Sequence, residues 1–334
     1  MVGKRPSVFV TSELPGKAVD GRPVLDPLRE IADCRVWNRA EMPQPEALRQ
    51  ELSGCEGLLC LLTDRVDRAV INASAALTTI SSCSVGVDHI DVTAATERGI
   101  PVGHTPGVLT DATADLAFGL LLAAARRIPE ADRFVRDHRW TPERRWEPRM
   151  LLGADLSGAT LGIVGLGPIG QAMARRAHGF GMRVVGWTRS QRPVDGVEAV
   201  SFPRLLEISD FVSVHVALVD ATRNLLDAAA LATMKPGAIV VNTSRGGIVD
   251  EDALARALAS GALGAAGVDV FDEEPLPEAS PLREAQNIVL APHIGSATYR
   301  TRESMARLAV DNLLAGLAGR PLPQCVNPEV RRRA

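Results

Sequence analysis

The sequence predicts an α/β protein with two domains, each built on a doubly wound parallel sheet. Three observations support this fold class. The chain has 334 residues, which is long enough for two domains. Short β-like runs alternate with helical stretches along the whole chain, as expected for parallel sheets covered by helices. Several runs in the middle of the chain are apolar throughout, which is typical of strands buried on both faces.

The first third of the chain follows this alternation and contains no glycine fingerprint. Helices are expected between its strands, for example over residues 45–53 and 67–75. The expected strands are SVFVTS (7–12), CRVWN (34–38), GLLCLL (57–62), LTTISSC (77–83) and IPVGHT (100–105).

The middle of the chain predicts a second sheet, flanked by two long connecting helices, one over residues 111–127 and one beginning near 296. Its strand-like runs are ATLGIVGLG, RVVGWT, DFVSVHV, AIVVNTS, AAGVDV and NIVLAPHI. We therefore expect one discontinuous domain, residues 1–104 with 297–334, and a second, continuous domain over residues 105–296. Because open α/β sheets bind ligands at the carboxyl ends of their strands, the cleft between the domains is the expected site.

Composition argues against several classes of protein. No apolar run is long enough to span a membrane or to form a secretory signal. The five cysteines match neither a zinc site nor a disulfide framework, which favours a cytoplasmic setting. A net charge of −3 argues against nucleic acid as the main partner. No metal cluster is expected.

Gly165, Gly167 and Gly170 form a G-x-G-x-x-G pattern between a buried strand and a helix. The first glycine permits a tight turn, the second lets the backbone approach a pyrophosphate, and the third lets helix and strand pack closely. The start of the helix would offer free N–H groups to the phosphates. Together with Pro168 and Ile169, this loop predicts a Rossmann-type dinucleotide site. The alternative is an ordinary strand–turn–helix.

The second strand of this unit lacks the acid that usually holds the adenosine ribose in an NAD site. Thr188, Arg189 and Ser190 stand there instead, within MRVVGWTRSQRP. A guanidinium donates two parallel hydrogen bonds to a phosphate, whereas a carboxylate would repel one. We therefore predict a preference for NADP(H). The alternative is that Arg189 stacks on the adenine and that NAD(H) binds as well.

Three polar residues follow apolar strands in the second half, namely Arg245, Glu274 and His293. Reduction of a 2-keto acid by a nicotinamide needs a group to hold the carboxylate, a group to polarise the carbonyl, and a proton donor. Arg245 can fill the first two roles. His293 can give the proton because histidine titrates near neutrality, and Glu274 would orient its ring. Spacing alone does not show that the three converge, so a surface arginine and a structural histidine stay open as alternatives.

Together, the glycine loop, NTSRGGIVDEDAL, AAGVDVFDEEPLP and NIVLAPHIGSAT resemble the D-isomer-specific 2-hydroxyacid dehydrogenase family. GLLCLLTDRVD, SSCSVGVDHIDV and GHTPGVLTDATADLA are similar to its glyoxylate/hydroxypyruvate reductase branch. The resemblance runs from Ser7 to Pro321. It implies a Rossmann-type cofactor domain, a flavodoxin-like substrate domain with an interdomain cleft, a homodimer, and a catalytic set of Arg245, Glu274 and His293.

The resemblance also implies roles outside the catalytic set. Backbone N–H groups of Val85 and Gly86 would bind the substrate carboxylate, and Ser296 would lie beside the substrate. Trp140, within DHRWTPERRW, would close the pocket of a partner subunit, although a buried or interface tryptophan is an equal alternative. The implied cofactor contacts are Ala217, Thr243, Asp269 and Gly295.

The expected function is therefore NADPH-dependent reduction of glyoxylate or hydroxypyruvate to the 2-hydroxy acid. Its expected partners are a small anionic keto acid and a second copy of the chain. Two alternatives stay open. One is another branch of the family, such as a D-lactate or phosphoglycerate dehydrogenase, and the other is a non-catalytic NAD(P)H-binding corepressor.

Overall fold

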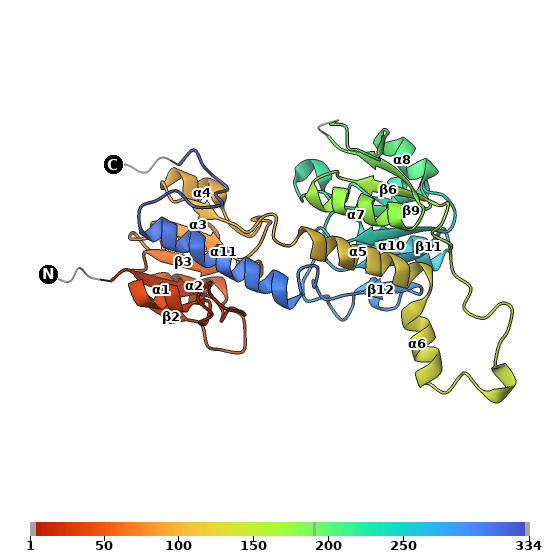
Figure 1. Cartoon of the computed structure of the whole chain (residues 1–334), viewed down its shortest axis with the longest axis horizontal. Coiled ribbons are helices and arrows are strands. Elements are labelled where there is room, and N and C mark those ends of the chain that lie inside the picture. The colour runs from red at the N-terminus through yellow and green to blue at the C-terminus, as the bar shows by residue number, and fades with distance from the viewer. Residues whose placement is uncertain (1–4, 190–191, 331–334) are drawn as a thin grey trace. The chain divides into compact units, whose positions relative to one another are not determined.

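The structure is a computed structural model that describes residues 5–189 and 192–330, and it divides into two compact units (Figure 1). The first unit comprises Met1–Leu109 and Ser296–Ala334, and the second comprises Thr110–Gly295. In the described residues every pairing between named strands is parallel. The predicted fold class, two α/β domains with parallel sheets, is therefore confirmed.

The first unit contains a sheet of five strands in the order β2-β1-β3-β4-β5. This order reverses direction between β1 and β3, as in doubly wound sheets of the flavodoxin type. The strands are short, and the buried ones are apolar or small because helices cover both faces. Their bounds are β1 (Ser7–Val10), β2 (Asp33–Val36), β3 (Gly57–Cys60), β4 (Thr79–Ser82) and β5 (Val102–Gly103).

Two apolar layers cover the sheet of the first unit. One face packs against α2 (Pro45–Leu52), α3 (Arg68–Asn72) and α4 (Val92–Glu97). The other face packs against α1 (Asp26–Ile31) and α11 (Tyr299–Leu317). The last helix of the chain thus completes the unit that the first strand begins.

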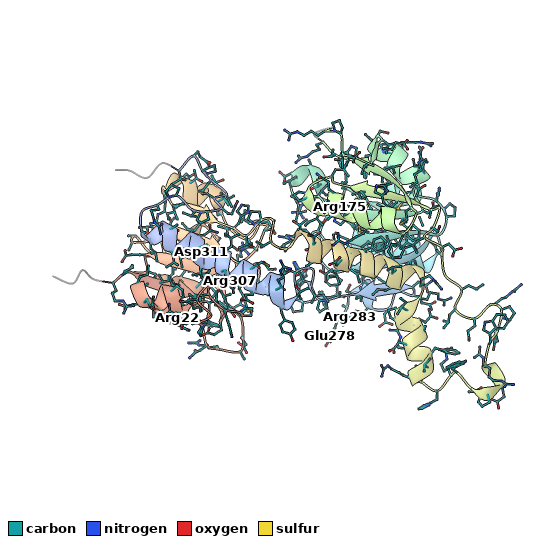
Figure 2. The ribbon with its side chains drawn as sticks, viewed as in Figure 1. Arg22, Arg175, Glu278, Arg283, Arg307 and Asp311 are labelled. Carbon is teal, nitrogen blue, oxygen red and sulfur yellow. The ribbon has the colours of Figure 1, made fainter. Side chains whose placement is uncertain are left out.

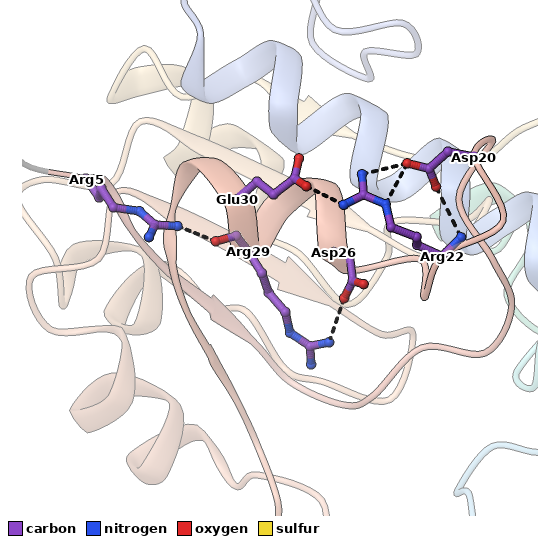
Figure 3. A network of polar contacts seen from close by, with 6 residues as sticks. All are labelled: Arg5, Asp20, Arg22, Asp26, Arg29 and Glu30. Carbon is purple, nitrogen blue, oxygen red and sulfur yellow. Dashed lines mark hydrogen bonds and ion pairs between the residues drawn. The ribbon is translucent and has the colours of Figure 1, made fainter.

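Exposed ion pairs surround α1 (Figure 3). Arg22 donates from Nε to Asp20 at 2.7 Å and also pairs with Glu30. Arg29 pairs with Asp26 at 3.3 Å, one turn away on the same helix. Because water screens exposed pairs, they stabilise the fold little. We therefore attribute the position of α1 to its buried apolar side.

The second unit contains a sheet of seven strands in the order β12-β11-β10-β9-β6-β7-β8. The order reverses between β6 and β9, which is where ligands bind in sheets of this kind. Six of these strands match the predicted runs. The seventh, β8, was missed because it is a two-residue edge strand with both residues exposed. The bounds are β6 (Thr160–Val164), β7 (Arg183–Trp187), β8 (Glu198–Ala199), β9 (Phe211–Val214), β10 (Ala238–Asn242), β11 (Leu263–Val268) and β12 (Ile288–Leu290).

Helices cover both faces of this sheet as well. One face packs against α5 (Thr110–Ala125) and α7 (Pro168–Gly179). The other packs against α8 (Phe202–Ile208), α9 (Ala228–Ala232) and α10 (Glu251–Ala259). Short 3-10 turns occur at η1 (Pro142–Arg144), η2 (Asp220–Thr222) and η3 (Pro281–Arg283).

The segment after α5 does not follow this arrangement of helices on the two faces of the sheet. Figure 1 shows α6 (Ile128–Arg136) and the loop that follows it extending away from the sheet of the second unit. Across residues 5–189 and 192–330, no helix combines the length and the apolar character that a bilayer crossing requires.

Candidate active site

Close backbone packing requires two of the three glycines in the loop between β6 and α7. Gly165 has φ +101°, and a Cβ there would lie 2.4 Å from the carbonyl oxygen of His215. A Cβ on Gly170 would lie 2.0 Å from the carbonyl oxygen of Gly165. At Gly167, by contrast, a Cβ would meet nothing within 4 Å. The loop therefore packs tightly at its two ends and leaves open space beside its middle glycine.

The start of α7 is suited to bind an anion in that space. The helix begins at Pro168, and no side chain caps it. The N–H of Gln171 makes the first helical bond, to Gly167 at 3.0 Å. Helix geometry then leaves the N–H groups of Ile169 and Gly170 without an intrahelical acceptor, at the positive end of the helix dipole. This arrangement fits a dinucleotide pyrophosphate.

A second feature that fits a cofactor lies after β10. The Thr243 side chain is buried, and its hydroxyl oxygen has no hydrogen-bond partner among the described residues. A buried polar atom without a partner is costly, and a ligand that supplied one would remove that cost. The second unit thus has open space beside Gly167 and, among the described residues, a buried Thr243 hydroxyl without a hydrogen-bond partner.

The predicted ribose-binding residues follow β7, next to the glycine loop. Trp187 ends that strand, and its carbonyl accepts from the N–H of Gly165 at 2.8 Å. Thr188 comes next, followed by Arg189, which is exposed. Ser190, the third predicted residue, lies outside the described residues.

His215 and the exposed Ala217 lie in the loop that follows β9. The imidazole Nε2 of His215 lies 2.8 Å from the hydroxyl of Ser213. Burial lowers the pKa of His215 to about 4, so the ring is neutral near pH 7. His215 is therefore unsuited to donate a proton at neutral pH.

Arg245 stands in a turn fixed by side chains of its own loop. The Asn242 amide donates to the carbonyl of Arg245 at 2.9 Å and accepts from the N–H of Ser244 at 3.0 Å. The Ser244 hydroxyl donates to the carbonyl of Val214 on the neighbouring strand at 2.6 Å. Asn242, the last residue of β10, was missed in the sequence, although asparagine at the start of a turn is a known turn signal.

His293 lies in a turn that is fixed by hydrogen bonds to Asp269. Three successive N–H groups donate to this one residue: His293 to its carbonyl at 2.8 Å, Ile294 to Oδ1 at 2.7 Å and Gly295 to Oδ2 at 2.8 Å. Burial raises the pKa of Asp269, and the hydrogen bonds from Ile294 and Gly295 oppose that rise. His293 has φ +53°, a conformation that persists only where its surroundings enforce it.

Glu274 completes a pair with His293. Its Oε2 lies 2.7 Å from Nδ1 of the imidazole, and its Oε1 accepts from the N–H of Phe271 at 3.0 Å. Burial alone would raise the pKa of Glu274. The His293 and Phe271 hydrogen bonds and the charge of Arg245 outweigh burial and lower that pKa. The carboxylate is thus ionised at neutral pH, and it is paired with Nδ1 of His293.

The structure therefore pairs Glu274 with His293 and brings the charge of Arg245 close enough to lower the pKa of Glu274, which sequence spacing did not show. A further residue supports this segment. Arg283 donates from Nε to the carbonyl of Pro277 at 2.8 Å and also to that of Leu276, just beyond Glu274 (Figure 2). No sequence signal identifies Arg283, because its role depends on carbonyls that the fold brings to it.

The other predicted residues lie elsewhere. Val85 and Gly86 follow β4 in the first unit, and the buried Ser296 is the first residue of that unit's C-terminal part. Trp140 is half-exposed in the loop after α6, and its indole donates to the carbonyl of Arg145 at 2.7 Å. Among the described residues, no group of three or more His, Cys, Asp or Glu side chains could hold a metal ion.

Comparison with known proteins identifies the family. Residues 118–295, which fall within the second unit, match the family model "D-isomer specific 2-hydroxyacid dehydrogenase, NAD binding domain". The chain belongs to the D-isomer specific 2-hydroxyacid dehydrogenase family. Family membership confirms the resemblance seen in the sequence, and makes the chain a nicotinamide-dependent oxidoreductase that acts on CH–OH groups.

Relatives match the chain over nearly its full length. A glyoxylate reductase of Korarchaeum cryptofilum is 46% identical over 98% of this chain and 97% of its own. The human glyoxylate reductase/hydroxypyruvate reductase is 46% identical over 95% of this chain and 96% of its own. A solved structure, the NADPH-dependent glyoxylate/hydroxypyruvate reductase of Sinorhizobium meliloti with NADP and malonate, is 34% identical. It has a TM-score of 0.86 and covers 99% of this chain and 100% of its own.

Replacing Glu274 by glutamine should change how stability depends on pH. Because the pKa of Glu274 is below its ordinary value of 4.5, its ionised form stabilises the fold above about pH 4.5. That stabilisation is lost as the pH falls through the lower folded-state pKa. The difference in melting temperature between wild type and Glu274→Gln should be largest near pH 7 and shrink toward pH 3.

Scanning fluorimetry across this pH range measures the difference. Glu278→Gln is the matched control, since Glu278 is an exposed glutamate of the same segment (Figure 2). An equal difference at every pH would show that the charge of Glu274 contributes nothing to stability.

Proposed function

We propose that this chain reduces small 2-keto acids, glyoxylate or hydroxypyruvate, to their 2-hydroxy acids, with NADPH as the preferred reductant. The observation that carries the proposal is the His293–Glu274 pair, with its 2.7 Å hydrogen bond, in the unit that bears the glycine loop. The names of the relatives support the choice of keto acids, because they are glyoxylate and hydroxypyruvate reductases.

In the proposed chemistry, protein groups bind the carboxylate and the keto oxygen of the substrate, and the nicotinamide acts on the keto carbon. Arg245 pairs with the carboxylate and polarises the keto oxygen through charge-assisted hydrogen bonds. The N–H groups of Val85 and Gly86 also donate to the carboxylate, and Ser296 lies beside the substrate. A bound nicotinamide supplies the hydride that adds to the keto carbon.

His293 supplies the matching proton in this proposal. Its Nδ1–H donates to ionised Glu274, which orients the ring. Nε2–H then faces the substrate and gives its proton to the keto oxygen as the carbon is reduced. The product is a 2-hydroxy acid, and the histidine is left neutral until solvent restores its proton.

For the cofactor, we assign the pyrophosphate to the loop of Gly165, Gly167 and Gly170 with Pro168 and Ile169. Ala217, Thr243 and Gly295 belong on the nicotinamide side. We assign Thr188 and Arg189 to the adenosine end, where a guanidinium suits a 2′-phosphate. Asp269 also belongs beside the cofactor in this proposal, where its carboxylate oxygens accept from the N–H groups of Ile294 and Gly295.

We also propose that the chain is a homodimer that uses the segment from α6 to residue 152. Large apolar side chains are exposed along it, including Trp140 (56%), Trp146 (77%) and Leu152 (63%). Apolar side chains gathered on one exposed segment mark an interaction surface. In this proposal Trp140 reaches the pocket of the partner subunit.

Replacing His293 by alanine should lower kcat for glyoxylate by about 100-fold or more, the usual scale of general-acid catalysis. NADPH binding, followed by fluorescence, should stay near the wild-type value, since the glycine loop is untouched. His178→Ala is the control, because His178 is an exposed histidine of α7. Turnover is followed as absorbance loss during NADPH oxidation with glyoxylate, hydroxypyruvate and pyruvate. Unchanged turnover in His293→Ala would remove His293 from the mechanism.

Charge reversal at Arg189 tests the cofactor preference. Arg189→Glu should raise KM for NADPH about tenfold or more and leave KM for NADH nearly unchanged, because only NADPH carries the 2′-phosphate. Arg175→Glu is the matched control, since Arg175 is an exposed arginine of α7 in the same unit (Figure 2). Equal effects of Arg189→Glu on both cofactors would overturn the phosphate assignment.

The dimer proposal predicts that polar substitution on the exposed segment separates the subunits. The double variant Trp146→Ser with Leu152→Ser should sediment as a monomer, whereas wild type sediments as a dimer. Tyr299→Ser, at an almost fully exposed aromatic of α11, should leave the dimer intact. Sedimentation velocity distinguishes these outcomes, and a monomeric wild type would contradict the proposal.

A further inference from the structure

The loop after β4 has three successive carbonyls tied into the first unit. The Ser84 carbonyl accepts from the N–H of Thr105 at 2.8 Å. The Val85 carbonyl accepts from Nδ1 of His104 at 3.0 Å, and the Gly86 carbonyl accepts from the Ser84 hydroxyl at 2.7 Å. Side chains therefore hold the last two of these peptide groups.

These bonds also fix the direction of the N–H groups. In a trans peptide the N–H points opposite to the C=O of the same plane. Binding the three carbonyls inward turns the N–H groups of Val85, Gly86 and Val87 away from the groups that hold the carbonyls. In the part of the chain that the structure describes, none of these three N–H groups has a protein acceptor. N–H groups without protein acceptors are available to donate to an anion.

The hydrogen-bond directions around His104 follow from the partners. A carbonyl oxygen only accepts, so Nδ1 of His104 carries the proton that Val85 receives. The backbone of His104 is anchored on both sides, since its N–H donates to Gln324 at 3.3 Å and its carbonyl accepts from the Asn312 amide at 2.9 Å. The donor is thus fixed relative to α11.

The Ser84 hydroxyl lies at the end of a series of hydrogen bonds whose donors can be assigned. Ser84 is buried, and its hydroxyl donates its single proton to the Gly86 carbonyl. The Ser82 hydroxyl, 2.7 Å away, must therefore donate to Ser84. His89 Nε2, 3.0 Å from Ser82, must in turn donate to Ser82. The hydrogen bonds therefore run in one direction, from His89 through Ser82 and Ser84 to the Gly86 carbonyl.

We propose that His104 and Ser84 are positioning residues for the substrate carboxylate. Together they form a peptide clamp, the His104 Nδ1–H and the Ser84 hydroxyl, that holds the 85–86 and 86–87 peptide planes with their N–H groups outward. The inference rests on the proposed function, in which Val85 and Gly86 bind the carboxylate, and it adds the Val87 N–H as a third donor. Donors fixed before binding do not have to be ordered by the substrate, which favours affinity.

Four variants test the clamp by steady-state kinetics with NADPH. His104→Ala and Ser84→Ala each remove one clamp donor. His104→Asn keeps a donor, because its amide nitrogen stands where Nδ1 stood. Ser81→Ala is the matched control, since Ser81 is a buried serine of β4 whose hydroxyl donates to the Ala309 carbonyl, also at 2.7 Å.

The expected result separates the substrate from the cofactor. KM for glyoxylate should rise about tenfold or more in His104→Ala and Ser84→Ala, the scale on which loss of one charge-assisted hydrogen bond acts. KM for NADPH should stay within about twofold, and His104→Asn should recover most of the glyoxylate affinity. The ratio of kcat/KM for glyoxylate to that for its uncharged amide should fall in both alanine variants, which general loss of structure would not produce.

Contrary results separate the clamp from the proposed function. An active wild type with unchanged KM for glyoxylate in both alanine variants overturns the clamp alone, as does an equal rise in Ser81→Ala. A wild type that reduces neither keto acid overturns the proposed function and the clamp with it. Thermal melting checks folding, and His104→Phe, which keeps the volume without the donor, replaces His104→Ala if that variant does not fold.

Discussion

Asp269 holds the turn that carries His293, and the geometry of the candidate site depends on that contact. Three successive N–H groups meet its carbonyl and both carboxylate oxygens. A carboxylate can be buried at this point because each oxygen has a donor. The same bonds keep His293 in a left-handed backbone conformation that would otherwise relax. The direction of its imidazole toward Glu274 follows from the path of the backbone there.

Both of the proposed anion sites in this molecule consist of backbone N–H groups. At the start of α7 the helix geometry itself leaves N–H groups unpaired beside Gly167. In the loop after β4, side chains achieve the same result by occupying the carbonyls. The two proposed sites therefore depend on different residues. The start of α7 depends on glycines, whereas the loop after β4 depends on His104 and Ser84, which bind its carbonyls.

Much of the fold was visible in the sequence because its cause is local. Buried parallel strands are apolar along their length, and the runs ATLGIVGLG and AIVVNTS contain β6 and β10. The two-residue β8 has no such run, because it lies at an exposed edge. The glycine pattern was equally visible, since each of its spacings has a steric reason that the structure bears out at Gly165 and Gly170.

The supporting residues of the site were not visible in the same way. Asn242, Arg283 and His104 act by binding carbonyls, and sequence does not say which carbonyls the fold brings within reach. The pairing of Glu274 with His293 likewise depends on the loop between β11 and β12, which spacing does not determine. The family resemblance suggested that pair, and the 2.7 Å contact now gives it a physical basis.

The route of the chain through the two units bears on its synthesis. The second unit is one continuous stretch, so all its residues are available once the ribosome has released residue 295. The first unit begins with β1, but α11, which packs on β3 and β4, is made only at the end of the chain. Until translation passes Leu317, one face of that sheet has no helix to cover it beyond α1. The unit that begins to be made first is therefore the last to be completed. Apolar surface exposed during synthesis is prone to aggregate, which is the condition that chaperones counter.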